Sequence, residues 1–153
     1  MARLDEGQAA PGFTLPSDRG EVVTLSSFLG GRVVLVFYPK AMTSGCTQQV
    51  CAYRDSLGVY SSLNVAVLAI SPDPVARLAS FREKENLTFP LLSDESHEVL
   101  EAYGVWVEKS MYGRTYMGVE RSTVVVGPDG LLEHLAYGVK PADDSARVLA
   151  LLG

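Results

Sequence analysis

A chain of 153 residues, 47% of them hydrophobic, can bury about two-thirds of the surface that its unfolded form exposes, which predicts one domain over residues 1–153. Thirteen Lys and Arg against eighteen Asp and Glu give a net charge of −5, and the basic residues are scattered along the chain. This charge pattern argues against a nucleic-acid partner, because binding to phosphates requires clustered basic residues.

The sequence predicts neither a membrane span nor an export signal. No stretch reaches the roughly 18 apolar residues of a span, and the first residues, MARLDEGQAAPGF, lack the apolar core of a signal peptide. We therefore expect a cytoplasmic protein with no membrane partner. Permanent disulfides are rare in a reducing cytoplasm, so Cys46 and Cys51, the only cysteines, are favoured for a catalytic, redox or metal-binding role.

Two apolar, β-branched runs predict buried strands at residues 33–38 (VVLVFY) and 65–71 (VAVLAIS). The segment between them has the length of a helix, and its apolar residues recur at spacings of three and four. This pattern predicts one stripe of side chains that faces the core, formed by Cys46, Val50, Tyr53, Leu57 and Tyr60. A strand, a helix and a buried strand in this order predict a βαβ unit with parallel strands.

Two further helices are expected after the second strand. Asp73 and Pro74 are typical of a helix start, and this helix is expected to end near Asn86. A shorter helix is expected over residues 97–103.

A loop rich in glycine and tyrosine is expected next. We interpret Arg114 as a residue of this loop. For Trp106, Tyr112 and Tyr116 we favour packing beneath the loop over the alternative, a surface for a reductant or a second subunit.

The last part of the chain predicts a hairpin and a helix. The runs 122–126 (STVVV) and 131–136 (LLEHLA) flank 127–130 (GPDG), whose residues suit a tight reversal, and residues 140–153 are helical in pattern. A short extension containing GEVVTLSSF (20–28) precedes the first strand. The order β-α-β-α-β-β-α matches a thioredoxin-like α/β fold, in which helices flank a central mixed sheet, here with an N-terminal β extension.

Cys46 is predicted to lie where the first strand passes into the helix. In α/β sheets ligands meet the protein at the carboxyl ends of strands, beside helix amino termini. If Thr43 or Ser44 caps the helix, Cys46 lies in its first turn, where free N–H groups and the helix dipole favour thiolate over thiol. The thiolate is the nucleophile. Gly45 lets a substrate approach the backbone, and the Thr43 hydroxyl lies one turn upstream of the sulfur.

The spacing of the two cysteines forbids a disulfide on an intact helix. Residues five apart lie about 140° around the axis and about 7.5 Å along it, so their Cα atoms are roughly 8.7 Å apart. A disulfide needs about 7 Å or less. We infer that Cys46 reacts in the folded helix and that Cys51 joins it only after the first turns unwind.

The segment YPKAMTSGCT (38–47) resembles the active-site loop of the peroxiredoxins, whose pattern is Pro, three residues, Thr or Ser, two residues, Cys. A second cysteine five positions on is similar to the atypical two-cysteine subgroup called bacterioferritin comigratory protein or PrxQ. The family often has Pro where Ser44 stands and Glu where Gln49 stands. The resemblance runs almost end to end, through PGFTLPSDRGEVVTLSSF, AISPDPVARLASFREKENLTFPLLSD and YGVWVEKSMYGRTYMGVERSTVVVGPDG.

The resemblance implies roles for five residues. Cys46 would be the peroxidatic cysteine of a thiol peroxidase, and Cys51 the resolving cysteine. Thr43 would orient the peroxide and Pro39 would shield the pocket from water. Arg121, in ERSTVVV, matches the arginine that the family places beside the thiolate.

The chemistry implied by the resemblance is the reduction of hydrogen peroxide and organic hydroperoxides. The thiolate of Cys46 becomes a sulfenic acid, which forms an intramolecular disulfide with Cys51. Thioredoxin or a similar dithiol reductant then restores both thiols. Because the partner thiol is in the same chain, turnover needs no subunit contact, and we expect a monomer.

Other classes of function stay open at this point. A thioredoxin-fold protein disulfide oxidoreductase without peroxidase activity usually carries C-x-x-C, whereas the spacing here is C-x-x-x-x-C. A metal-binding module needs three or four ligands, and His97 and His134 show no ligand spacing, so we expect no metal and no cofactor. A non-enzymatic scaffold would leave the pattern of Pro39, Thr43 and Cys46 without a purpose.

Overall fold

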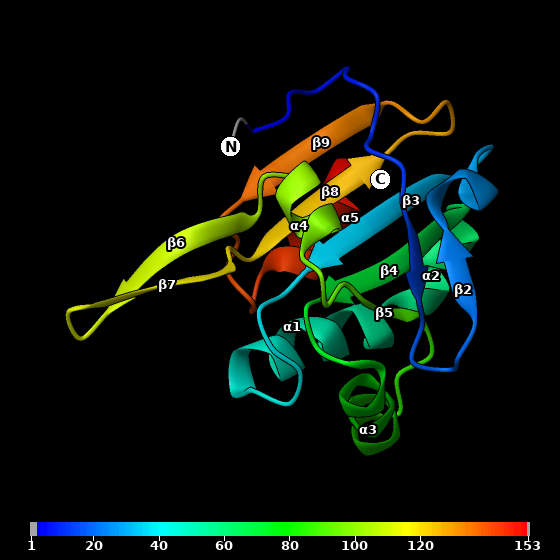
Figure 1. Ribbon diagram of the computed structural model, residues 1–153. Coiled ribbons are helices and arrows are strands. Elements are labelled where there is room, and N and C mark those ends of the chain that lie inside the picture. The colour runs from blue at the N-terminus through cyan, green and yellow to red at the C-terminus, as the bar shows by residue number, and fades with distance from the viewer. Residues whose placement is uncertain (1–2, 153) are drawn as a thin grey trace.

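The computed structural model describes residues 3–152, which fold around a five-stranded mixed sheet with the strand order β5-β4-β3-β8-β9 (Figure 1). In its parallel half, β3 (Arg32–Phe37) pairs with β4 (Val65–Ser71), and β4 pairs with β5 (Leu91–Ser93). In its antiparallel half, β3 pairs with β8 (Ser122–Val126), and β8 pairs with β9 (Leu132–Tyr137). The predicted βαβ unit, the final hairpin and the thioredoxin-like sheet are confirmed.

The helices connect and cover these strands. Their bounds are α1 (Ser44–Asp55), α2 (Leu57–Ser62), α3 (Val75–Glu85), α4 (Glu98–Ala102) and α5 (Asp144–Leu152), with a short 3-10 turn, η1 (Leu25–Phe28). The predicted end of α3 is confirmed, since Asn86 ends it with a left-handed φ of 54°. Its start is one residue later than expected, because Pro74 is the capping residue and the helix begins at Val75. Among residues 3–152 no helix has the length and apolar character needed to cross a membrane. Residues 1, 2 and 153 of the predicted domain lie outside the described residues.

Both faces of the sheet are buried, which explains the unbroken apolar run of β3. Val34 and Val36 point toward the side chains of α1, α2, α3 and α5, and Val33, Leu35 and Phe37 toward α4 and the N-terminal extension. Side chains alternate along a strand, so a strand between two covered faces needs apolar residues at every position. The result is a sheet between two layers, with α1, α2 and α3 on one side of it in Figure 1.

The predicted stripe on the helix after β3 is buried as expected. Cys46 is 1% exposed, Val50, Tyr53 and Tyr60 are 0% exposed, and Leu57 packs against the same cluster. The single helix predicted from this stripe is interrupted at Ser56, so that Tyr60 lies on α2.

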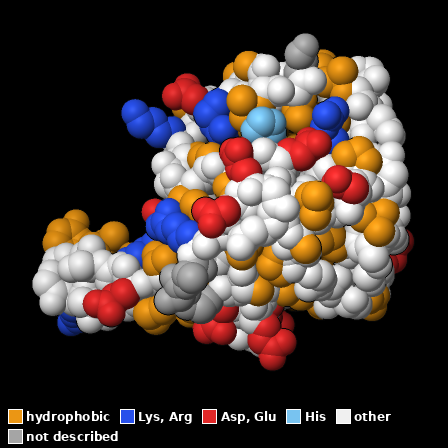
Figure 2. All heavy atoms as spheres, turned by 90° about the horizontal axis from the view of Figure 1, so that it is seen from above, with side chains coloured by type: hydrophobic (Ala, Val, Ile, Leu, Met, Phe, Trp, Pro, Cys, Tyr) orange, Lys and Arg blue, Asp and Glu red, His pale blue; other side chains and the backbone are white. Residues whose placement is uncertain are grey.

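The segment predicted as a loop after α4 is instead a β-hairpin, and that prediction was wrong. The strands β6 (Trp106–Met111) and β7 (Arg114–Val119) pair antiparallel through a turn at Tyr112 and Gly113, whose φ values of 53° and 77° suit a two-residue hairpin turn. Arg114 therefore opens a strand. The expected packing of Tyr112 and Tyr116 is also wrong, because these side chains are 97% and 45% exposed, whereas Trp106 is half-buried. The hairpin projects from the body of the molecule and carries hydrophobic side chains on its surface (Figures 1 and 2).

The N-terminal β extension is confirmed, and one strand of the central sheet was not predicted. In the extension, β1 (Thr14–Pro16) and β2 (Val22–Thr24) pair antiparallel. The missed strand is β5, whose three residues are too few to show a hydrophobic period.

Candidate active site

Cys46 is the third residue of α1, just beyond the carboxyl end of β3 (Figure 1). Thr43 has an extended backbone and is the residue that caps the helix, although its side chain makes no capping hydrogen bond. The sulfur thus lies in the first turn, where the helix dipole and the N–H groups without intrahelical partners favour a negative charge. The predicted position of Cys46 at a strand-to-helix junction is found in the structure.

The guanidinium of Arg121 contacts the sulfur directly. Its Nη1 donates to Cys46 Sγ over 3.4 Å and to Gln49 Oε1 over 2.7 Å. Arg121 comes immediately before β8, which pairs with β3, so the sheet itself brings this arginine to the start of α1. A guanidinium this close to sulfur stabilises the thiolate by Coulomb attraction and hydrogen bonding.

The absence of a side chain at Gly45 makes room for this arginine. A Cβ atom built on Gly45 would lie 3.3 Å from Arg121 Nη2 and 3.5 Å from Pro141 Cγ. The first of these contacts is tighter than most Cβ contacts. The sequence suggested that Gly45 admits a substrate, and the structure places the guanidinium of Arg121 at that position.

A buried carboxylate, that of Asp144, accepts a hydrogen bond from the side chain of Gln49. Asp144, which is 1% exposed, accepts hydrogen bonds at Oδ2 from Gln49 Nε2 (2.9 Å), Tyr53 Oη (2.7 Å) and Thr123 Oγ1 (2.6 Å). Its other oxygen accepts a bond of 2.8 Å from Arg147 Nη2. Burial and the carboxylate raise the pKa of Tyr53 well above its usual range, which keeps that hydroxyl a donor. Asp144 thus connects α1, β8 and α5 to the arginine at the sulfur.

The loop between β3 and α1 is held by the start of α3. Asp73 Oδ2 accepts a hydrogen bond of 2.7 Å from the N–H of Ala41, and Arg77 Nη2 donates one of 2.8 Å to the carbonyl of Ala41. Met42, next along the loop, has a φ of 66°, a left-handed conformation that a residue with a Cβ adopts at a cost. The Thr43 hydroxyl donates to the carbonyl of Lys40 over 2.8 Å. In this state it does not donate to the sulfur.

A shallow hollow of about 300 Å³ separates this loop from the β6–β7 hairpin. Pro39 and Lys40 line one side, and Trp106, Lys109 and Met117 are among the residues of the other. Burial lowers the pKa of Lys109, as does the positive charge of Arg121, whereas the charges of Cys46 and Glu120 raise it. Lys109 is thus a second cation that acts electrostatically on the cysteine.

Cys51 is also a free thiol, and it lies in the same unbroken helix as Cys46. The helical geometry that forbids a disulfide is therefore present. The half-buried sulfur of Cys51 donates to Glu85 Oε1, at the end of α3, over 3.6 Å. Burial raises the pKa of the Cys51 thiol, Arg54 lowers it and Glu85 raises it.

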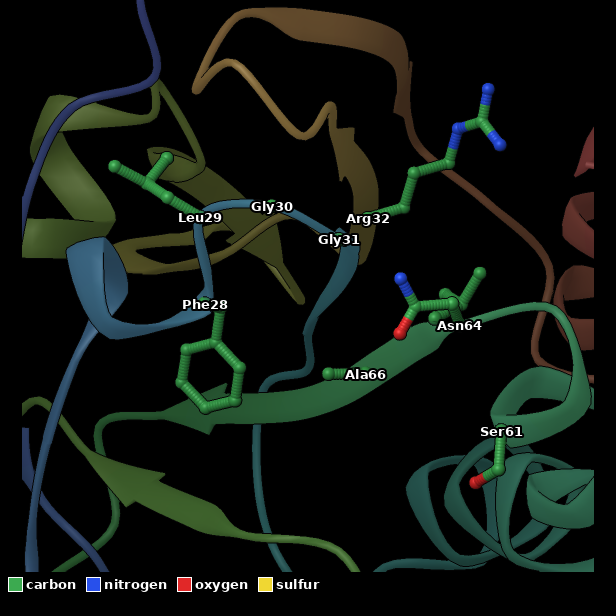
Figure 3. A pocket seen from close by; sticks show the side chains of 9 residues that line it. Phe28, Leu29, Gly30, Gly31, Arg32, Ser61, Asn64 and Ala66 are labelled. Atoms are coloured by element: carbon green, nitrogen blue, oxygen red, sulfur yellow. The ribbon is translucent and has the colours of Figure 1, made fainter.

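A larger hollow, of about 520 Å³, lies at the opposite end of the sheet (Figure 3). It is formed where β3 and β4 begin, between the turn at Gly30 and Gly31 and the segment from Ser61 to Ala66. Arg32, which borders it, is already paired with Glu133 over 2.7 Å. Because Cys46 follows the other end of β3, this hollow takes no part in the chemistry of the cysteine.

Neither histidine lines the hollow beside Pro39, although His97 packs behind one of its residues, Trp106. His97 stacks on Trp106 with ring centroids 3.8 Å apart, and His134 lies on β9. In residues 3–152 no group of three or more His, Cys, Asp or Glu side chains is arranged to hold a metal ion.

Sequence reasoning missed three residues of the site. Gln49 was noted only as a departure from the resembling family, and Asp144 and Lys109 were not singled out. Asp144 is separated from Gln49 by 95 residues, and the only local signal was an acidic residue at a helix start. Lys109 is brought near the cysteine by the hairpin that was read as a loop.

A thioredoxin-like sheet with a buried cysteine at a helix start and an arginine at its sulfur defines a class of proteins, the thiol enzymes of the thioredoxin fold. The model of the AhpC/TSA family matches residues 6–135, and the chain belongs to this family.

The relatives specify the kind of enzyme. The chain is 49% identical over 149 residues to the peroxiredoxin Bcp of Escherichia coli K12, covering 97% of this chain and 96% of that protein. It is 42% identical over 149 residues to the peroxiredoxin Bcp of Bacillus subtilis, covering 97% of this chain and 95% of that protein. It is accordingly a Bcp/PrxQ peroxiredoxin, a thiol-dependent peroxidase.

Solved structures agree with this assignment. A PrxQ of Xylella fastidiosa superimposes with a TM-score of 0.94 at 30% identity, covering 99% of this chain and 97% of that chain. A bacterioferritin comigratory protein of Xanthomonas campestris, described for its alkyl peroxide reduction activity, superimposes with a TM-score of 0.88 at 33% identity, covering 92% of this chain and 89% of that chain.

Proposed function

We propose that Cys46 is the peroxidatic cysteine of this peroxidase. The observation that carries the proposal is the contact of 3.4 Å between Arg121 Nη1 and the sulfur of Cys46. The thiolate attacks one oxygen of the peroxide, the sulfur–oxygen bond forms as the oxygen–oxygen bond breaks, and the other oxygen leaves as hydroxide or alkoxide, which takes a proton from solvent to give water or an alcohol. Cys46 is then a sulfenic acid.

Three further residues assist this step. Arg121 stabilises the negative charge that develops on the peroxide oxygens, and its bond to Gln49 holds the guanidinium in place for this purpose. Thr43 orients the peroxide, because its hydroxyl lies on the loop one turn before the sulfur and can both donate and accept hydrogen bonds. Pro39 lines the hollow beside this loop and shields the pocket from water.

The substrates we propose are hydrogen peroxide and organic hydroperoxides. The hollow beside Pro39 offers an apolar wall to an organic group through Trp106, Met117 and Val119. One of its polar residues, Lys109, is near enough to Cys46 for the charge of the sulfur to raise its pKa. An organic hydroperoxide has a matching arrangement, with a polar peroxide group that reacts and an apolar group that packs against an apolar surface.

Cys51 is proposed as the resolving cysteine. Its sulfur attacks the sulfenic sulfur, the sulfur–sulfur bond forms as the sulfur–oxygen bond breaks, and the leaving hydroxide takes the thiol proton and departs as water. Since both cysteines lie in α1, this step requires the helix to unwind locally. Thioredoxin or a similar dithiol then reduces the disulfide.

The protein is proposed to act as a cytoplasmic monomer formed by a single domain over residues 1–153, without a cofactor, a metal, a nucleic-acid partner or a membrane partner. Support for the monomer is that both reacting thiols belong to one helix. The net charge of −5 with scattered basic residues supports the absence of a nucleic-acid partner.

Intact mass after one equivalent of hydrogen peroxide tests the cysteine roles. We expect the wild type to lose about 2 Da as the disulfide forms and Cys51→Ser to gain about 16 Da as a sulfenic acid accumulates. Cys46→Ser is expected to react no faster than a free thiol. Reduction of a disulfide substrate without peroxide consumption would instead support the alternative, a thioredoxin-fold protein disulfide oxidoreductase.

A further inference from the structure

Glu85 binds α1 at two points, one of which is the thiol of Cys51. Its carboxylate accepts the hydrogen bond from Cys51 Sγ over 3.6 Å, a distance within the range of bonds that involve sulfur. Its main-chain carbonyl accepts a bond of 2.6 Å from Arg54 Nη1. Cys51 and Arg54 are three residues apart and therefore neighbours on the helix surface. The end of α3 thus holds the third turn of α1 through a single residue.

The charges around Cys51 keep it a thiol while α1 is folded. The charged groups that face it are Arg54 and Asp55 on α1 and Glu85 on α3. Burial raises the pKa of the thiol most, Arg54 opposes this effect, and Glu85 adds to it both by charge and by hydrogen bonding. A thiol is a poor nucleophile, so Cys51 is unreactive in this position.

Glu85 is a poor base for removing this proton. The negative charge of Glu85 and its hydrogen bond to the sulfur both raise the pKa of the Cys51 thiol. A carboxylate beside the sulfur therefore disfavours the thiolate instead of generating it. The contact stabilises the folded helix and the protonated form of Cys51 together.

We propose that Glu85 is a positioning residue that holds Cys51 on the folded helix, so that breaking this contact sets the rate at which the disulfide forms. The inference rests on the proposed role of Cys51 as the resolving cysteine. The contact must be lost in any path to the disulfide, because the hydrogen that Cys51 donates to Glu85 leaves with the hydroxide of the sulfenic acid. Glu85 thereby lengthens the lifetime of the sulfenic acid on Cys46. A longer lifetime increases the chance that a second peroxide oxidises Cys46 to the sulfinic acid.

The test compares Glu85→Gln with the matched control Glu83→Gln. Both remove one negative charge from α3, but Glu83 is exposed and makes no side-chain hydrogen bond in the described residues. Rapid acid quench after one equivalent of hydrogen peroxide, followed by intact mass, separates sulfenic acid from disulfide at each time. We expect the sulfenic acid to disappear about 3- to 10-fold faster in Glu85→Gln than in the wild type. At excess peroxide, Glu85→Gln should accumulate less sulfinic acid, and Glu83→Gln should match the wild type.

A second measurement reports on the contact itself. In a Cys46→Ser background, the pH dependence of alkylation gives the pKa of Cys51, which we expect to fall when Glu85→Gln is added. A Glu85→Gln variant that folds poorly would fail to form the sulfenic acid on Cys46. In that case Glu85→Asp is the second variant, because it withdraws the carboxylate from Cys51 by one methylene. We expect Glu85→Asp to speed disulfide formation as well. Disulfide formation at the wild-type rate or slower in a folded variant overturns the proposal. A wild type that forms no disulfide at all overturns instead the proposed role of Cys51, and the inference with it.

Discussion

Gln49 Nε2 donates a hydrogen bond of 2.9 Å to Asp144 Oδ2 in the interior of the protein, three residues along α1 from Cys46. The same glutamine accepts a bond from Arg121 with its other terminal atom. An amide can do both because it has a donor and an acceptor on one group. The carboxylate at the start of α5 is in this way connected to the guanidinium at the sulfur.

Asp144→Ala should therefore be strongly destabilising. The substitution leaves Gln49, Tyr53 and Thr123 without their acceptor and removes the partner of Arg147. Three unpaired buried donors and the loss of a partly exposed ion pair lead us to expect a loss of about 3 to 5 kcal/mol in the free energy of unfolding, most of it from the donors. Urea denaturation followed by circular dichroism measures it.

Asp5→Ala is the matched control, since Asp5 is exposed and its side chain makes no hydrogen bond in the described residues. It should change the free energy of unfolding by about 0.5 kcal/mol or less. A loss of similar size in both variants would contradict the assignment of Asp144 as the connecting group.

Gln49→Glu is expected to lower both stability and activity. A carboxylate at this position cannot donate to Asp144 unless it is protonated, so two negative groups would face each other in the interior. The pairing of Arg121 with a charged group would strengthen, but the support from Asp144 would be lost. We expect a free-energy loss of about 2 kcal/mol, and Gln49→Met, which removes both bonds without adding charge, separates the repulsion from the loss of hydrogen bonding.

Arg121 can be compared with another arginine of the same region. Arg121→Ala should lower the second-order rate constant for peroxide by about 100-fold or more, because a preorganised donor at the developing charge is lost. Arg114→Ala, on the exposed strand β7, should leave the rate unchanged. Competition kinetics against a peroxidase of known rate provides the measurement, and equal effects of the two substitutions would refute the role of Arg121.

Site residues that are close together in the sequence could be predicted, whereas those far apart in the sequence could not. Pro39, Thr43 and Cys46 stand within eight positions of one another, so a helix start and a thiol could be recognised together. Arg121 lies 75 residues from Cys46 and was reached only through the family resemblance. Asp144 was not reached at all, because no local pattern states which buried groups a carboxylate will meet after folding.

The same distinction holds for the fold. The strands β3 and β4 are apolar on both faces and were predicted with nearly their observed ends. The β6–β7 hairpin was misread, since most of its side chains are exposed and no apolar face marks a period of two. The remaining sequence signal for a hairpin was the glycine at position 113, because Tyr112 and Gly113 form a two-residue turn with positive φ at both positions.

Arg77 gives a test of the loop that carries the motif. Arg77→Met removes the bond to the carbonyl of Ala41 and the ion pair of 3.2 Å with Asp73. Because Arg77 is partly exposed, we expect the free energy of unfolding to fall by only about 1 kcal/mol. A loop displaced near Thr43 should nevertheless slow the reaction with peroxide about 10-fold, since small misplacements of reacting groups are costly. Arg19→Met, which alters an exposed arginine between β1 and β2, is the control for both measurements.

Lys109 should respond to the redox state of Cys46. The charge of Cys46 raises the pKa of Lys109, whereas burial and Arg121 lower it. Oxidation to the disulfide removes the negative charge of the sulfur, so the pKa of Lys109 must fall further when the protein is oxidised. NMR titration of reductively methylated lysines in the two states measures this shift, and Lys109→Met identifies the resonance.

The interaction is reciprocal: an ammonium group whose protonation the thiolate favours must in turn stabilise that thiolate. Lys109→Met should therefore slow the oxidation of Cys46, by about 3-fold since the lysine is partly exposed, and the difference should shrink at high ionic strength. Lys40→Met is the matched control, because Lys40 lines the same hollow but its side chain is exposed, so that solvent and salt screen its charge more strongly. An effect of Lys109→Met that persists unchanged in high salt would show that this lysine acts by packing and not by charge.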